Sequence, residues 1–309
     1  IYTLSLHDAL PIWLFYRKKR KGITDLMKKI ALIHDLSGFG RCSLTAAIPV
    51  VSALGIQACP LPTAVLSAQT GFNSYFYDDY TDKMNQITQE WVQMNESFDG
   101  IYSGFLGSDA QMENVLYFLD QFQTKDNLYV ADPVMGDHGR RFPIFTDKLL
   151  AAMQELTRRA DVITPNLTEL CLLTDTDYDT LTSHSSSPEY FRYIEEAALP
   201  LLEKAVRKQS IIITGVISTD TEEPRIANLA VTSEGCCFVQ TPYTGKGFSG
   251  TGDLFTSCVT GCLVNEMPLQ QSLDKAVAFL QPAIEQSTSE NTPGEHGVCF
   301  EKYLYLLHR

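Results

Sequence analysis

The sequence predicts an α/β protein with three layers, in which a mostly parallel central sheet is covered by helices on both faces. From Met27 onward, short apolar runs alternate with stretches of helical periodicity, which is the rhythm of repeated βαβ units. The chain of 309 residues is 44% hydrophobic and 20% charged, an ordinary globular composition that can bury a substantial core. One α/β domain is therefore the simplest organisation.

The expected elements alternate along the chain. Apolar runs predict core strands at 29–34, 56–61, 99–102, 127–131, 161–164 and 210–214. Stretches in which apolar residues recur at helical spacing predict helices at 41–54, 82–95, 109–124, 146–158, 188–207, 252–264 and 270–286. Two further apolar runs, 226–231 and 236–240, flank a short turn and predict an antiparallel hairpin at the sheet edge. The polar segment from Tyr178 to Pro188 is expected to be a surface loop.

The first 26 residues do not fit this pattern. The apolar stretch from Leu10 to Tyr16 is too short to span a bilayer, and basic residues follow it, whereas a signal peptide carries its charge first. Met27 reads as a natural start that leads directly into a core strand. We therefore expect residues 1–26 to be a non-native or disordered extension, with a functional basic tail as the alternative. Residues 27–309 are expected to form one domain of a cytoplasmic protein.

Charge and cysteine content narrow the class of protein. The formal net charge of −13 argues against a nucleic-acid-binding surface. The eight cysteines show neither repeated C-x-x-C pairs nor zinc-site spacing, so we expect mostly buried, reduced thiols. Cys258 and Cys262 have the spacing to face a metal ion on a helix, but they lie within an apolar stripe, which favours packing.

The segment from Ser249 to Ser257 has the most informative sequence. Its glycines, Gly250 and Gly252, precede an apolar-periodic run that predicts a helix of about three turns beginning near Gly252 or Asp253. Such a turn lets the first helical N–H groups converge on a phosphate, with the helix dipole behind them. Asp253 beside this cradle could accept a proton from an incoming hydroxyl, or it could simply cap the helix.

Several polar residues follow predicted strands. Asp132 and Thr164 come at the ends of two of them, Thr214 ends a third, and His34 to Ser37 end the first. In an open α/β sheet, ligands bind at the carboxyl ends of the strands. The sequence therefore predicts that these residues share one edge of the sheet with a single site.

The motifs resemble those of the ribokinase superfamily, and within it the pyridoxal kinase group, whose C-terminal signature is G-T-G-D followed by an apolar helix. Four further segments resemble family motifs in the family's order: Ser37–Arg41, Leu66–Phe72, Asp132–Asp137 and Thr164–Glu169. The resemblance covers nearly the whole chain from Met27 onward. It implies the ribokinase-like three-layer fold and a homodimer.

The resemblance also implies catalytic and metal-binding roles. Asp253 matches the base that acts on the primary hydroxyl of the substrate, and Gly250, Thr251 and Gly252 would form the anion hole for the transferred phosphoryl group. Asp132 and Glu169 would be the acids on the side of Mg²⁺, a hard ion that binds carboxylates and phosphates. Together with Thr164, they match a monovalent-cation site, for which K⁺ is the expected ion. Taken alone, Asp132 could cap a turn and Glu169 could be a solvated acid.

The resemblance also implies which residues contact the substrate and the nucleotide. Ser37 and Thr70 match residues that contact the polar edge of the pyridine ring, although either could serve a turn. Asn166 and Thr214 match positions near the nucleotide phosphates, and both could be local caps. The segment that begins at Asp137 occupies the place of a loop that covers the nucleotide and excludes water.

One departure from the family pattern bears on specificity. Many pyridoxal kinases carry S-N-H-T-G-Y in the second substrate loop, whereas this chain has Ser67-Ala68-Gln69-Thr70-Gly71-Phe72. An imidazole and a phenol hydroxyl are therefore missing. Since the B6 vitamers differ at the 4′ substituent, the preferred vitamer stays open.

The sequence thus predicts ATP-dependent phosphorylation of the 5′-hydroxymethyl group of a B6 vitamer. Hydroxymethylpyrimidine kinase is the nearest alternative, but that group usually reads G-T-G-C where this chain has Asp253. A sugar kinase would carry a strand-built lid that is not evident between residues 34 and 75. A non-catalytic vitamer-binding module is the alternative from another class.

Overall fold

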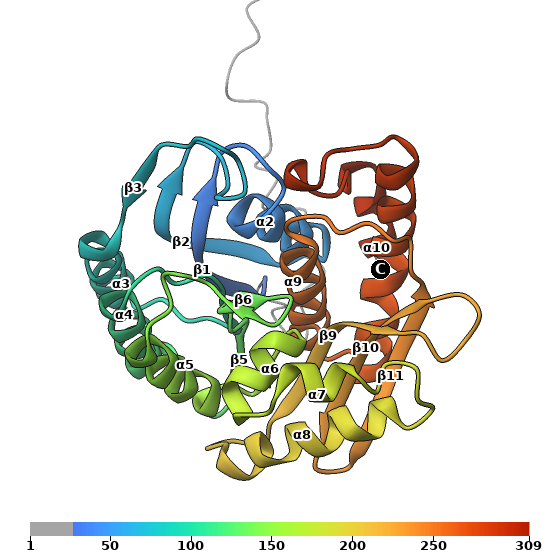
Figure 1. The fold of residues 1–309 in the computed structure, drawn as a ribbon. Helices are drawn as coiled ribbons and strands as arrows, with labels where there is room; N and C mark the ends of the chain where they lie inside the picture. Colours follow the sequence, from blue (N-terminus) through green and yellow to red (C-terminus); the bar gives the residue numbers. More distant parts are fainter. Residues whose placement is uncertain (1–26, 309) are drawn as a thin grey trace, which may run out of the picture.

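The computed structural model describes residues 27–308. It shows three layers, in which a nine-stranded sheet lies between two layers of helices (Figure 1). The prediction for residues 1–26 lies outside the described residues. The strand order is β11-β10-β9-β8-β5-β4-β1-β2-β3. The strands are β1 (Lys29–Ser37), β2 (Gln57–Leu66), β3 (Tyr77–Asp79), β4 (Gly100–Ser103), β5 (Leu128–Ala131), β8 (Val162–Ile163), β9 (Ser210–Ser218), β10 (Arg225–Thr232) and β11 (Gly235–Pro242).

The centre of the sheet is parallel and its edges are antiparallel. Strands β2, β1, β4, β5, β8 and β9 pair in parallel, which brings their carboxyl ends to one edge. Strand β3 is antiparallel to β2, and β10 and β11 extend the other side as the expected antiparallel hairpin. A second, separate hairpin is formed by β6 (Gly136–Asp137) and β7 (Arg140–Arg141).

Helices cover both faces of the sheet. One face packs against α3 (Thr81–Gln93), α4 (Asp109–Phe122), α5 (Asp147–Arg159), α6 (Leu167–Thr174), α7 (Tyr178–Thr182) and α8 (Tyr190–Lys204). The other packs against α2 (Ser43–Ala53), α9 (Thr251–Val264), α10 (Leu269–Ser289) and the 3₁₀ helix Glu301–Leu307. Within β1, Ile30 and Leu32 belong to one apolar layer, and Ala31 and Ile33 to the other, because successive side chains of a strand point to opposite faces.

The predicted strands and helices are confirmed, with boundaries that differ by a few residues. Helix α9 begins at Thr251, slightly before the expected start. Helix α6 was not foreseen. The prediction of a surface loop from Tyr178 to Pro188 is wrong in its first half, where α7 forms because the Asp177 side chain accepts a hydrogen bond from Thr180 N and caps the helix.

Thr214 does not end its strand as expected. The pairing of β9 with β8 stops at Ile211, but β9 continues to Ser218 because β10 pairs with it on the other side. Opposite Asn228 the register shifts, so Thr214 and Gly215 face one residue of β10. Gly215 has a φ of +67°, as a glycine-containing bulge requires. The bulge places Thr214 beside Asn166, with which it forms an isolated bridge.

The cysteines are free thiols, as predicted. Cys42, Cys171, Cys258 and Cys262 are buried, whereas Cys236 is exposed and the others are half-buried. Cys258 and Cys262 pack in the apolar layer between α9 and the sheet. Within residues 27–308, no helix is both long enough and apolar enough to cross a membrane.

Candidate active site

Three adjoining cavities follow the carboxyl edge of the sheet. We call them the inner cavity (≈ 540 Å³), the middle cavity (≈ 200 Å³) and the outer cavity (≈ 290 Å³). Gly250 and Asp253 line both the inner and the middle cavity. Asp137, Thr214 and Gly252 line both the middle and the outer cavity. The beginning of α9 therefore stands where all three cavities meet.

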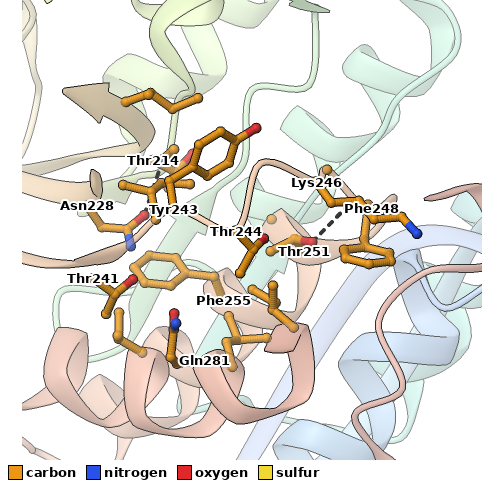
Figure 2. A pocket seen from close by; sticks show the side chains of 18 of the residues that line it. Thr214, Asn228, Thr241, Tyr243, Thr244, Lys246, Phe248, Thr251, Phe255 and Gln281 are labelled. Atoms are coloured by element: carbon orange, nitrogen blue, oxygen red, sulfur yellow. Dashed lines mark hydrogen bonds between the residues drawn. The ribbon is translucent and has the colours of Figure 1, made fainter. Parts of the chain in front are cut away.

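The cavities differ in chemistry. The inner cavity combines polar residues of β1 with the loop after β2 and with the apolar side chains of Phe105, Val134, Phe142 and Ile144. The middle cavity is lined by carboxylates, hydroxyls, one amide and glycines, with Val134 and Phe142 as its apolar side chains. The outer cavity is mainly apolar, with walls from β9, β10, β11, α9 and α10 and a few polar groups such as Asn228, Thr241 and Gln281 (Figure 2).

The turn before α9 brings two distant parts of the chain into contact. Gly250 is the N-cap residue and has a φ of +76°. A Cβ atom at this position would lie 1.9 Å from the carbonyl oxygen of Arg41, so only glycine fits. The Thr251 hydroxyl closes the turn by donating to the Phe248 carbonyl (2.8 Å) (Figure 2). The start of α9, whose first N–H groups have no partner within the helix, lines the middle and inner cavities, which is the position that an anion cradle requires.

Asp253 does not cap its own helix, so the capping alternative is wrong. Its Oδ1 atom lies 2.9 Å from His34 Nε2, and its Oδ2 atom accepts a hydrogen bond from Ser43 N, the first amide of α2 (2.8 Å). The side chain keeps 13% of its surface exposed, at the junction of the inner and middle cavities. A carboxylate with free lone pairs at this junction can accept a proton from a bound hydroxyl.

His34 lies between two carboxylates. Its Nε2 atom contacts Asp253 and its Nδ1 atom lies 3.1 Å from Asp35 Oδ1. Burial disfavours the charged ring, but the charge of Asp253 and hydrogen bonds to both acids outweigh it and raise the pKa of His34 to about 10. Burial would likewise raise the pKa of Asp35, but the hydrogen bond with His34 lowers it below its ordinary value. The two carboxylates thus favour the imidazolium form of His34, although Asp35 N also lies 3.1 Å from Nδ1.

Asp132 and Glu169 form the acidic wall of the middle cavity. Both are buried, and burial raises the pKa of Asp132 to about 7, helped by the charge of Asp253. Burial followed by the charge of Asp132 raises the pKa of Glu169 well above its ordinary value. Glu169 is not the solvated acid of the alternative reading, because it accepts hydrogen bonds from Met135 N (3.1 Å) and Asn166 N (2.8 Å). Thr164 lines the same cavity.

The residues predicted for the nucleotide reach the middle cavity. Asn166 and Thr214 line it, and Asp137 lines both it and the outer cavity from the β6–β7 hairpin. Asn166 is also a helix cap: it forms a capping box with Glu169, and its amide donates to the Gly136 carbonyl (2.9 Å). Asn166 thereby ties the hairpin to the start of α6.

Ser37 and Thr70, the residues expected to contact the substrate, both line the inner cavity. The Ser37 hydroxyl donates to Asp35 Oδ2 (2.8 Å), so the pair presents an oriented polar edge. Gln69 stands where the family motif has an imidazole. Its amide donates to the Glu295 carbonyl (3.0 Å) and accepts from Gly71 N (2.6 Å), which fixes the loop against the segment before the C-terminal helix.

The sequence did not assign several site residues. His34 and Asp35 were placed at the sheet edge but given no role, and the walls of the outer cavity were not foreseen. Those walls come from the bulge of β9, the hairpin β10–β11 and α10, and these segments carry no recognisable motif. One signal in the sequence indicated a role for His34 and Asp35: they are two polar residues directly after the apolar run of a buried strand.

Of the described residues, no group of three or more His, Cys, Asp or Glu side chains forms a metal-binding cluster. The donor set of the middle cavity nevertheless fits a hard cation held jointly with phosphate oxygens and water, because Asp132 presents a buried carboxylate there without a cationic side chain among the lining residues.

Known proteins resemble this chain along most of its length. The model of a family described as phosphomethylpyrimidine kinase matches residues 40–298. A pyridoxal kinase PdxY of Leifsonia xyli is 27% identical over 81% of this chain and 86% of its own. A Bacteroides thetaiotaomicron protein assigned as a phosphomethylpyrimidine kinase was solved in a form with pyridoxal; it is 39% identical, covers 91% of this chain and 96% of its own, and has a TM-score of 0.83.

A pyridoxal kinase structure from Lactobacillus plantarum is 28% identical, with a TM-score of 0.80 over 91% of this chain and 97% of its own. These likenesses establish the ribokinase-like fold predicted from the motifs.

Replacing Asp132 with Asn should stabilise the ligand-free protein at pH 8. The folded state raises the pKa of this acid from 3.8 to about 7, so the cost of burying its charge grows between these values and is full above about pH 7. We expect Asp132→Asn to raise the free energy of unfolding by on the order of 2 kcal/mol at pH 8 and by much less at pH 4, measured by urea titration. The exposed Asp126→Asn is the control, and a less stable Asp132→Asn at pH 8 would contradict the prediction.

Replacing Gly250 with Ala should destabilise the protein by at least about 2 kcal/mol, because the residue has a left-handed backbone and the new methyl group would overlap the Arg41 carbonyl. Gly252→Ala is the matched control: a Cβ there meets nothing within 4 Å, so its stability should change by less than about 1 kcal/mol. Thermal unfolding of both variants checks this. Equal melting temperatures would show that the contact of Gly250 with Arg41 is not needed.

Proposed function

The chain belongs to the phosphomethylpyrimidine kinase family, and on this premise we propose that it transfers the γ-phosphoryl group of ATP to the 5′-hydroxymethyl group of a B6 vitamer. The observation that carries the proposal is the position of Asp253. It stands beside the anion cradle of α9, at the junction of a cavity for an acceptor molecule and a cavity for phosphates.

The inner cavity suits a small heteroaromatic alcohol. Apolar side chains provide surfaces for a flat ring, and Ser37, Asp35 and Thr70 provide polar groups for its substituents. The volume of ≈ 540 Å³ leaves room for a pyridine ring with its substituents. The relatives named pyridoxal kinase and the similar protein solved with pyridoxal support this substrate class over a pyrimidine.

The outer cavity suits the nucleoside of ATP. It is mainly apolar, as a purine-binding pocket needs, and the middle cavity connects it to Asp253. A nucleotide that fills the outer cavity would thus extend its phosphates toward the N-terminus of α9. Asn166, Thr214 and Asp137 would then face the phosphate chain.

Cations belong to this proposal. Asp132, with Glu169 and Thr164 beside it, would hold Mg²⁺ through phosphate oxygens and water, and K⁺ is the expected monovalent ion. Mg²⁺ supplies neutralisation of the charge that develops on the transferred group. Burial raises the pKa values of Asp132 and Glu169, which makes their ionised forms costly. A nearby cation would favour those ionised forms.

The protein's own groups account for the remaining chemistry. Asp253 accepts the proton of the 5′-hydroxyl as the new O–P bond forms and ADP leaves with the electrons of the old one. The amides of Gly250, Thr251 and Gly252 and the helix dipole stabilise the negative charge on the phosphoryl oxygens. The β6–β7 hairpin, whose turn has positive φ at His138 and Gly139, would cover the phosphates and keep water out.

A kinase acting on hydroxymethylpyrimidine is the second candidate, because the matching family carries the name of that activity. Asp253 counts against this activity, because hydroxymethylpyrimidine kinases usually have Cys at this position of the G-T-G-C motif. The homodimer implied by the family resemblance is also a prediction, which light scattering of the purified protein would test.

The test is ADP release with Mg²⁺ and K⁺ present, comparing pyridoxal, pyridoxamine, pyridoxine and hydroxymethylpyrimidine. We expect turnover of at least one B6 vitamer, and a fall in kcat of at least about 100-fold in Asp253→Asn, because an amide cannot accept the proton. Asp126→Asn, an exposed acid that lines none of the three cavities, is the control and should leave kcat unchanged. Turnover of hydroxymethylpyrimidine alone would favour the second candidate. No ADP release with any of the four would refute a kinase of either class.

A further inference from the structure

His34 occupies a position that the reaction described above does not use. Its side chain is 3% exposed and contacts Asp253 and Asp35 through its two ring nitrogens. Two carboxylates on opposite sides of one imidazole ring fix the ring plane, and the ring in turn fixes the carboxylates. Since the family resemblance assigned no role to this residue, the question is what the contact does for Asp253.

The fold is built to accommodate this ring. A Cβ atom on Gly104, just after β4, would lie 2.0 Å from His34 Nε2, so the ring fills space that only glycine leaves open. Tyr102 of β4 packs edge-on against the imidazole, with ring centroids 6.0 Å apart. Strands β1 and β4 and helix α9 thus hold His34 from three sides, and its orientation is determined by packing as well as by the two hydrogen bonds.

The surroundings of His34 make it the positive charge of the inner cavity. The titratable groups that face it are Asp35 from β1, Asp253 from α9 and Tyr102 from β4, and Asp132 after β5 acts on it through its charge. Neither Lys nor Arg lines the inner cavity. His34 is therefore the one group that can place a positive charge between the carboxylates of Asp35 and Asp253 within the inner cavity.

We propose that His34 is a positioning residue for phosphoryl transfer: its ring, held between Asp35 and Asp253, orients the Asp253 carboxylate toward the acceptor hydroxyl. This inference rests on the proposed function. His34 keeps both of its ring protons throughout; the proton of the acceptor hydroxyl passes to Asp253 as the O–P bond forms and the bond to ADP breaks. The role of His34 is geometric and electrostatic.

Two substitutions separate the two contacts. In His34→Gln the side-chain amide reaches the place of Nε2 and can still donate to Asp253, whereas in His34→Asn it reaches only the place of Nδ1. We expect kcat to fall about 10- to 100-fold in His34→Asn, as for the loss of a charge-assisted hydrogen bond, and the Gln variant to retain a kcat several-fold higher. The KM for ATP should stay near that of the wild type in both.

The pH dependence adds a readout that a purely structural role would not move. Both variants remove a positive charge that lies between two carboxylates, so the acidic limb of the kcat profile should move to higher pH. Gly104→Ala, which keeps the residues His34, Asp35 and Asp253 but displaces the His34 ring, should lower kcat in the same way. His184→Asn is the control, because His184 lines none of the three cavities. It should change neither kcat nor the pH profile.

A measurement without turnover tests the arrangement itself. In protein labelled with ¹⁵N-histidine, the His34 ring should carry two N–H protons at pH 7.5, and Asp253→Asn should shift Nε2 more than Nδ1. A neutral ring, or one insensitive to Asp253, overturns the inference. So do wild-type kcat and pH profile in His34→Asn. If the wild type phosphorylates none of the tested alcohols while the ring is doubly protonated and sensitive to Asp253, the proposed function fails and the placement of His34 stands.

Discussion

The contact between the beginning of α9 and the turn that leads into α2 is the constraint on which the site depends. Gly250 lies against the Arg41 carbonyl, and Asp253 accepts the first amide of α2 while touching His34. Residues some two hundred positions apart in the sequence are joined here. Because the turn, the cradle and the carboxylate are held by one contact, the geometry of the site is set by the packing of α9 on α2 and the sheet.

Charge is the second determinant of the site. Asp35, Asp253, Asp132 and Glu169 lie along one groove, and His34 is the buried cation that faces the first two. The raised pKa values of Asp132 and Glu169 reflect the cost of burying acids that face one another. In the proposed reaction, the cations that accompany the nucleotide would offset this cost.

Much of the fold was predictable. Buried parallel strands have sequences of short apolar runs, and the G-T-G-D segment is followed by the apolar periodicity of a helix. The placement of Asp132, Thr164 and the segment from His34 to Ser37 on one edge followed from their positions at the ends of strands, where ligands bind in an open α/β sheet. Helix α7 was missed because Asp, Thr and Ser serve caps and turns alike. The bulge at Gly215 was missed because a register shift depends on the partner strand.

The sequence by itself determined the layers of the fold, the glycine turn and the position of Asp253 beside that turn, since each depends on local periodicity or on residues that are neighbours in the chain. Only the tertiary structure decided that Asp253 bonds to His34 and Ser43 and does not cap its helix, that Thr214 sits on a bulge, and that β10, β11 and α10 enclose the outer cavity. These features arise from contacts between distant segments, and a pairing of that kind leaves no periodic signal in either segment alone.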